Sequence, residues 1–70
     1  MFYSNHKGLP EDTLGKRIYK QRMINGLGTV ELAKMLGVSK VAVQWWENGI
    51  GNPRKKNMDK LCEVFGVESL

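Results

Sequence analysis

The stretch that decides the fold is residues 37–49, GVSKVAVQWWENG. Ser39 is expected to cap a helix through its hydroxyl group, and at about 100° per residue the positions after it fall into two stripes. The inner stripe is apolar: Ala42, Val43 and Trp46. The outer stripe combines a cation, two amides, a branched apolar group and an indole, without an acid: Lys40, Val41, Gln44, Trp45 and Asn48. A face of this composition predicts a surface that reads a partner.

Length and composition limit what the chain can be. Seventy residues suffice for one small domain, and apolar spacing without strand-like alternation favours an all-α fold. Eleven Lys and Arg against seven Asp and Glu give a net charge of +4, which favours polyanionic partners. No apolar run approaches the roughly 20 residues needed to span a bilayer, so we expect a cytoplasmic protein.

The sequence holds little that suggests a metal, a cofactor or catalysis. Cys62 is the single cysteine, and its spacing with Met58, Leu61 and Phe65 predicts a small buried apolar residue. The one histidine, His6, has no companion ligand at metal spacing, and no nucleophile stands beside a histidine. We therefore expect no enzyme, no cofactor and no metal site.

The N-terminal part reads as an arm followed by a helix. Residues 1–9 lack periodicity and predict a flexible arm, which either has no role or touches phosphates through His6 and Lys7. The first helix is expected to begin near Pro10, with Leu14 and Ile18 on its buried stripe.

One charged residue of this first helix needs a partner. Arg22 lies at the edge of the buried stripe, where an unpaired charge is costly. Glu47 lies at the border between the two stripes of the 37–49 segment. We predict that these two side chains form a structural ion pair.

Two short helices are predicted around a tight turn. Residues 29–36 form the first, with Leu32, Ala33 and Leu36 on its inner face and Glu31 placed to bond back to the helix start. Gly37 permits a left-handed turn before Ser39 opens the next helix, an arrangement typical of a helix-turn-helix. Residues 50–56 read as a loop that ends in three cations, and residues 58–65 as the last helix.

The order of these features resembles the helix-turn-helix family of Cro and lambda-type phage repressors. The similarity spans residues 14–67, and its motifs are Gly26-Leu27, Glu31-Leu32-Ala33, Leu36-Gly37-Val38-Ser39, Trp46-Glu47-Asn48-Gly49, Asn52-Pro53 and Gly66-Val67. The resemblance implies a compact four- to five-helix bundle of the lambda-repressor-like type, with residues 10–70 as the DNA-binding domain. Thr29 stands where the family often has glutamine, and Gly28 where it often has a hydroxyl cap.

The resemblance also assigns roles to residues. It places Lys40, Val41 and Gln44 against base edges in the major groove. Trp45 is a further base-contact candidate, with the sugar-phosphate edge or its own helix as alternative places for the indole. The implied phosphate contacts are Thr29, Asn48, Arg54 and Lys56.

The predicted function is sequence-specific binding of double-stranded DNA by a transcriptional regulator. A small domain without an activating surface fits a repressor better than an activator. The resemblance implies a pseudo-palindromic operator and a homodimer on DNA, with weak self-association off DNA, and leaves open a complete small regulator or the DNA-binding part of a longer repressor. The alternative is a protein-interaction module, such as an antitoxin or partner-docking domain, that uses Val41, Trp45 and Ile50.

Overall fold

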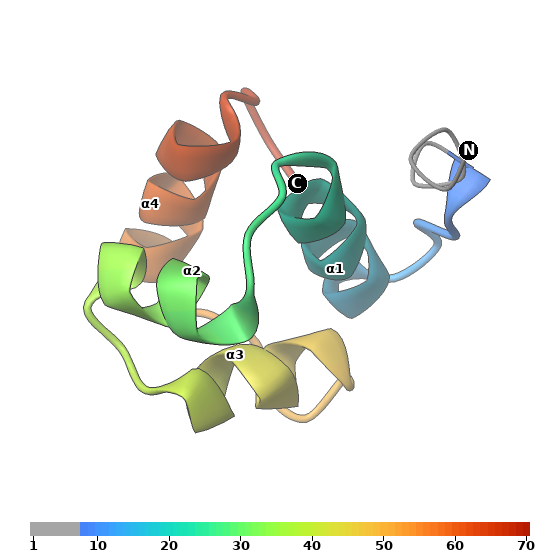
Figure 1. The fold of residues 1–70 in the computed structure, drawn as a ribbon. Helices are drawn as coiled ribbons and strands as arrows, with labels where there is room; N and C mark the ends of the chain where they lie inside the picture. The colour runs from blue at the N-terminus through green and yellow to red at the C-terminus, as the bar shows by residue number, and fades with distance from the viewer. Residues whose placement is uncertain (1–7) are drawn as a thin grey trace.

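The computed structural model describes residues 8–70 and contains four α-helices, with no strand in that range. The helices are α1 (Leu14–Ile24), α2 (Thr29–Leu36), α3 (Lys40–Glu47) and α4 (Lys55–Phe65). Helix α2 packs against both α3 and α4, while α1 packs against α3 (Figure 1). The predicted all-α class is confirmed. The predicted arm, with His6 and Lys7, lies largely outside the described residues.

Local caps decide where the two central helices begin and end. The Ser39 hydroxyl accepts a hydrogen bond from the Ala42 amide at 3.2 Å, as predicted, and starts α3. The Glu31 carboxylate accepts from the Gly28 amide at 2.7 Å, so it serves the start of α2 that a glycine cannot cap. Gly37 ends α2 in the left-handed conformation, with φ of 75°. These caps fix the predicted bounds of α2.

The other two helices begin at different residues from those predicted. Helix α1 starts at Leu14 rather than near Pro10, because the Thr13 hydroxyl accepts from the Lys16 amide and caps it there. Helix α4 starts at Lys55, three residues before the predicted start, with the Met58 amide bonded to the Arg54 carbonyl at 2.8 Å. Two cations expected in a loop, Lys55 and Lys56, therefore lie in the first turn of α4.

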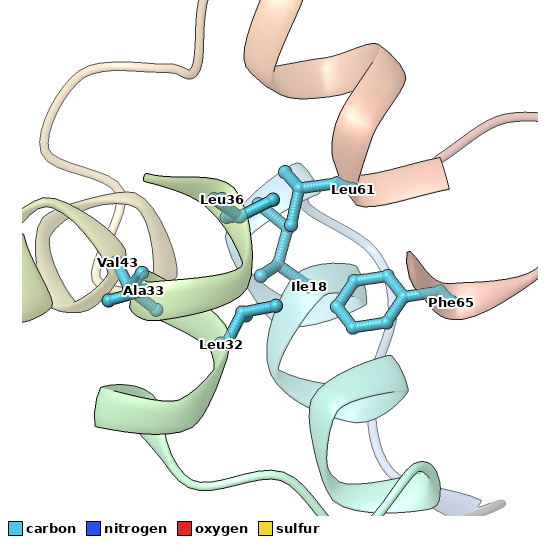
Figure 2. Packing of buried hydrophobic residues seen from close by; sticks show 7 residues of the cluster. All are labelled: Ile18, Leu32, Ala33, Leu36, Val43, Leu61 and Phe65. Carbon is cyan, nitrogen blue, oxygen red and sulfur yellow. The ribbon is translucent and has the colours of Figure 1, made fainter. Parts of the chain in front are cut away.

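The core is built from one stripe of each helix (Figure 2). Its buried members are Ile18, Leu32, Ala33, Leu36, Val43, Leu61 and Phe65. Trp46 packs against this cluster but is only partly buried, so Val43 rather than the indole is the buried centre of α3. The prediction of a buried Cys62 is wrong: Leu61 and Phe65 occupy the inner line of α4 and leave Cys62 half-exposed on its flank.

Candidate nucleic-acid interface

Helix α3 has the two faces that its sequence predicts. Val43 is completely buried, and Ala42 and Trp46 are half-buried beside it. The five side chains of the predicted outer face are all exposed: Lys40, Val41, Gln44, Trp45 and Asn48. The core therefore holds α3 by one side and presents the other to solvent. This is the orientation that a helix needs to enter the major groove.

The C-terminal end of α3 extends the outer face with apolar surface. The Gly49 amide donates to the Trp46 carbonyl at 3.2 Å, and the Ile50 amide donates to the Trp45 carbonyl at 2.8 Å. With Gly49 at φ of 79°, these bonds form a Schellman motif, which brings the residue after the glycine back toward the last turn. Trp45 and Ile50 are 52% and 58% exposed. Both large side chains are thus presented at the same end of the helix.

A buried ion pair fixes this end of α3 to α1. Arg22 Nε lies 2.7 Å from Glu47 Oε2 and Nη2 lies 3.0 Å from Oε1, which makes the pair bidentate, and the two side chains are only 11% and 9% exposed. The ion pair predicted from the helical phases is therefore present. The hydrogen bond to Glu47 raises the pKa of Arg22 above its ordinary value, against the opposing effect of burial, so the guanidinium stays charged.

The same guanidinium reaches a third segment of the chain. Arg22 Nη1 donates to the Leu27 carbonyl at 3.0 Å, and the guanidinium carbon lies 5.1 Å from the centre of the Tyr19 ring. Leu27 immediately precedes Gly28, the N-cap of α2. Arg22 therefore ties together α1, the approach to α2 and the last residue of α3, which are the parts whose relative placement decides the geometry of the outer face.

Gly15 is a structural determinant of the site that the sequence analysis did not identify. A Cβ atom at this position would lie 2.4 Å from the Trp46 carbonyl oxygen and 2.8 Å from that of Glu47. At Gly15, helix α1 thus lies too close to the end of α3 to leave room for a side chain. The available signal was a glycine just inside a helical pattern, where it costs about 1 kcal/mol relative to alanine unless packing requires it.

The predicted phosphate-contacting residues come from three helices. Thr29 is half-buried at the first residue of α2, and Asn48 is exposed at the end of α3. Arg54 and Lys56 are exposed at the start of α4, whose first turn contains no acid and whose N-cap makes no side-chain capping bond. Cations at the positive end of a helix dipole repel it, and an anion bound there removes that conflict. The start of α4 is therefore electrostatically suited to an anion.

Two further features are absent from residues 8–70, a cluster of metal ligands and a membrane-spanning helix. No group of three or more His, Cys, Asp and Glu side chains in this range is arranged to hold a metal ion. None of the helices in the described part of the chain has the length and apolar character required to cross a membrane.

Comparison with known proteins places the chain in a family. Residues 16–70 match the model of the helix-turn-helix family, so the chain belongs to that family, as its resemblance to Cro and lambda-type repressors predicts. The fold is similar to that of the P22 c2 repressor protein, whose crystal structure is of a complex with the synthetic operator 9T in the presence of Tl⁺. The two chains share 29% sequence identity with a TM-score of 0.78, over 83% of this chain and 88% of that one. No curated protein matches the sequence.

Proposed function

We propose that this protein binds double-stranded DNA with sequence specificity through α3 and acts as a transcriptional regulator, as a repressor. The observation that carries the proposal is the exposed outer face of α3, held by the core and the Arg22–Glu47 pair in a helix-turn-helix. The similarity to a repressor in complex with its operator supports the same function. A small DNA-binding domain can repress transcription by occupying a promoter. This kind of repression requires no additional surface that recruits polymerase.

The three exposed side chains on the first turns of α3 each suit a different base. Lys40 donates to the O6 and N7 acceptors of guanine, and Val41 packs on thymine methyl groups. Gln44 makes a bidentate pair with adenine, in which its side-chain oxygen accepts from N6 and its side-chain nitrogen donates to N7. All three are exposed on the same face of the helix. Trp45 follows on this face and covers either a further base or the edge of the sugar-phosphate backbone.

Phosphate contacts set the register of α3 in the groove. The proposed contacts are the backbone amides around Thr29, Asn48 at the end of α3, and Arg54 and Lys56 at the start of α4. Two copies of the chain on a pseudo-palindromic operator would present their α3 helices about one DNA turn, ~34 Å, apart. The homodimer forms mainly on DNA, and self-association in solution is weak.

The proposal is tested by replacing a base-reading side chain. Lys40→Ala or Gln44→Ala is expected to cost about 1 to 3 kcal/mol of binding free energy on the preferred site and to relax preference at one base pair. The preferred site is found by selection from random duplexes, and affinities are then measured by fluorescence anisotropy. Lys16→Ala, which removes a cation from α1 outside the proposed contacts, is the matched control. Equal losses on preferred and random duplexes contradict base reading.

A phosphate contact is expected to behave differently. Lys56→Ala should weaken binding to all duplexes alike and reduce the slope of log K against log salt by about one unit, because one fewer counterion is released. Titrations at four salt concentrations measure this slope. A loss confined to the preferred sequence, or a slope equal to that of the parent protein, would remove Lys56 from the proposed phosphate contacts.

The exposed apolar surface favours one alternative function. Val41, Trp45 and Ile50 are 43%, 52% and 58% exposed, which leaves three large apolar side chains in solvent on one helix and its flank. A protein-interaction module on the same fold would use them to dock a partner. Electrophoretic mobility of genomic fragments separates the two: retardation at low and moderate salt supports DNA binding. Absence of any retarded fragment, together with a co-purifying partner lost on Trp45→Ala, supports the interaction module.

A further inference from the structure

The chain contains two Asn-Gly dipeptides in the same structural position. Asn25-Gly26 ends α1 and Asn48-Gly49 ends α3, with the asparagine as the C-cap in both helices. The asparagine φ and ψ angles are −85° and 2° at Asn25 and −93° and 6° at Asn48, and the glycine φ angles are 66° and 79°. The backbones at the two sites are therefore closely alike, and any difference in chemistry arises from what surrounds them.

An asparagine followed by glycine can lose its side-chain amide without an enzyme. The backbone nitrogen of the glycine attacks the asparagine Cγ and forms a carbon–nitrogen bond. The Cγ–Nδ2 bond breaks, and the side-chain nitrogen leaves as ammonia with the proton that the glycine N–H gives up, so that a succinimide remains. Water then opens the ring to aspartate or isoaspartate. A following glycine favours ring closure because no Cβ atom obstructs the approach. Closure requires the asparagine ψ to turn far from zero, so the helix cap must open first.

Three contacts oppose this opening at the end of α1. The Asn25 side-chain Nδ2 donates to the Gln21 carbonyl at 2.8 Å, and this bond must break before the side-chain amide can turn toward the Gly26 nitrogen. Leu27, the residue after the glycine, packs against the core, and its carbonyl accepts the Arg22 hydrogen bond at 3.0 Å. Opening this cap therefore breaks a side-chain bond, withdraws an apolar side chain from the core and leaves a guanidinium N–H unpaired.

None of these contacts has a counterpart at the end of α3. Within residues 8–70 no hydrogen bond involves the Asn48 side chain, and Ile50, which takes the place of Leu27, is 58% exposed. Opening costs only the Gly49–Trp46 and Ile50–Trp45 backbone bonds, and water is available to both amides released. We infer that Asn48-Gly49 is a site of spontaneous deamidation and that Asn25-Gly26 is protected from it.

The consequence of the reaction rests on the proposed function. Asn48 is a proposed phosphate contact, and either product places a carboxylate there and lowers the formal net charge of +4 by one unit. In isoaspartate the main chain passes through Cβ and is one atom longer. The Gly49 and Ile50 amides are then displaced from the Trp46 and Trp45 carbonyls, which disrupts the Schellman motif. The protein would lose DNA affinity as Asn48 deamidates. Deamidation at this site would thus act as a slow timer that limits how long the regulator stays active.

The chemical part of the inference is tested without DNA. The folded protein is incubated at neutral pH, and peptides containing each dipeptide are assayed by mass spectrometry and isoaspartate detection. We expect deamidation at Asn48 to be about fivefold or more faster than at Asn25, the factor that a single net hydrogen bond supplies. The urea-unfolded chain is the matched control, and there the two sites should react at similar rates. Equal rates in the folded protein, or no reaction at Asn48, would overturn the inference.

The functional part is tested with a product mimic. Asn48→Asp is expected to bind the selected duplex about five- to tenfold more weakly at ~0.1 M salt, with a smaller loss at higher salt, because added charge near phosphates is screened. Asn48→Gln should stop the mass change at this site, and its affinity should stay constant during incubation. Deamidation at Asn48 without a change in DNA affinity overturns the timer. Failure of the parent protein to bind any duplex overturns the proposed function and leaves the mass measurement to decide the chemistry.

Discussion

Replacing Arg22 with alanine is expected to lower the free energy of unfolding by about 3 to 5 kcal/mol, measured by urea unfolding of the purified protein. The substitution leaves the Glu47 carboxylate, on a side chain only 9% exposed, without its bidentate partner and removes the donor that satisfies the Leu27 carbonyl. Because the single hydrophobic core of a chain of this length rarely supplies more than about 3 to 5 kcal/mol of stability, this change should unfold much of the population at 25 °C.

A double-mutant cycle separates the pair from the packing of its two side chains. Glu47→Ala should be nearly as harmful as Arg22→Ala, since it strands a buried guanidinium, while the double variant should cost clearly less than the sum of the two. The exposed pair Lys55–Asp59, at 3.1 Å, is the matched control and should show little coupling. If Arg22 and Glu47 couple no more strongly than the exposed pair, the proposed role of the ion pair in holding α3 is wrong.

This ion pair was predictable because both charges lie on the borders of amphipathic stripes. On two helices that share one core, a cation and an acid that both lie between the buried and the exposed face have few other partners. The bounds of α2 and the start of α3 were predictable for a similar reason, because Glu31, Gly37 and Ser39 act on backbone groups within three residues of themselves. Such short-range hydrogen bonds can be predicted from residue type and spacing alone.

The start of α4 was not predictable by the same rules. Lys55 and Lys56 in a first turn oppose the helix dipole, so local electrostatics favour a loop there. The structure accepts that cost because residues from Lys55 onward continue the helix whose Leu61 and Phe65 complete the core. Within the helix, the ion pair between Lys55 and Asp59, at 3.1 Å, offsets part of this cost, and a bound phosphate would offset the charges that remain.

The burial of side chains on the flank of a helix could also not be predicted from the sequence. Periodicity places Cys62 and Trp46 on apolar stripes, but it does not say how wide a stripe the neighbouring helices cover. Leu61 and Phe65 take the inner line of α4, and Val43 takes that of α3, so both flanking side chains remain partly exposed. The width of an interface depends on the distance between helices, which is a property of the assembled fold.

That distance is set for α1 and α3 at Gly15, and Gly15→Ala is expected to destabilise the protein by about 1 to 3 kcal/mol. The new methyl group would overlap backbone oxygens of Trp46 and Glu47, which cannot rotate away as a side chain can. The better helix propensity of alanine, about 1 kcal/mol, offsets only part of this strain. Urea unfolding measures the loss, with Lys16→Ala, an exposed neighbour in the same helix, as the control expected to change stability little.

The same substitution should also affect recognition, because relief of the overlap requires α3 to move away from α1. In the proposed function, the outer face would then meet the groove in a different register. Binding to the preferred duplex should weaken while the salt slope stays unchanged, since no phosphate contact is removed and bases alone lose their alignment. A folded Gly15→Ala protein that binds as the parent does, with undiminished stability, would show that this close approach does not position α3.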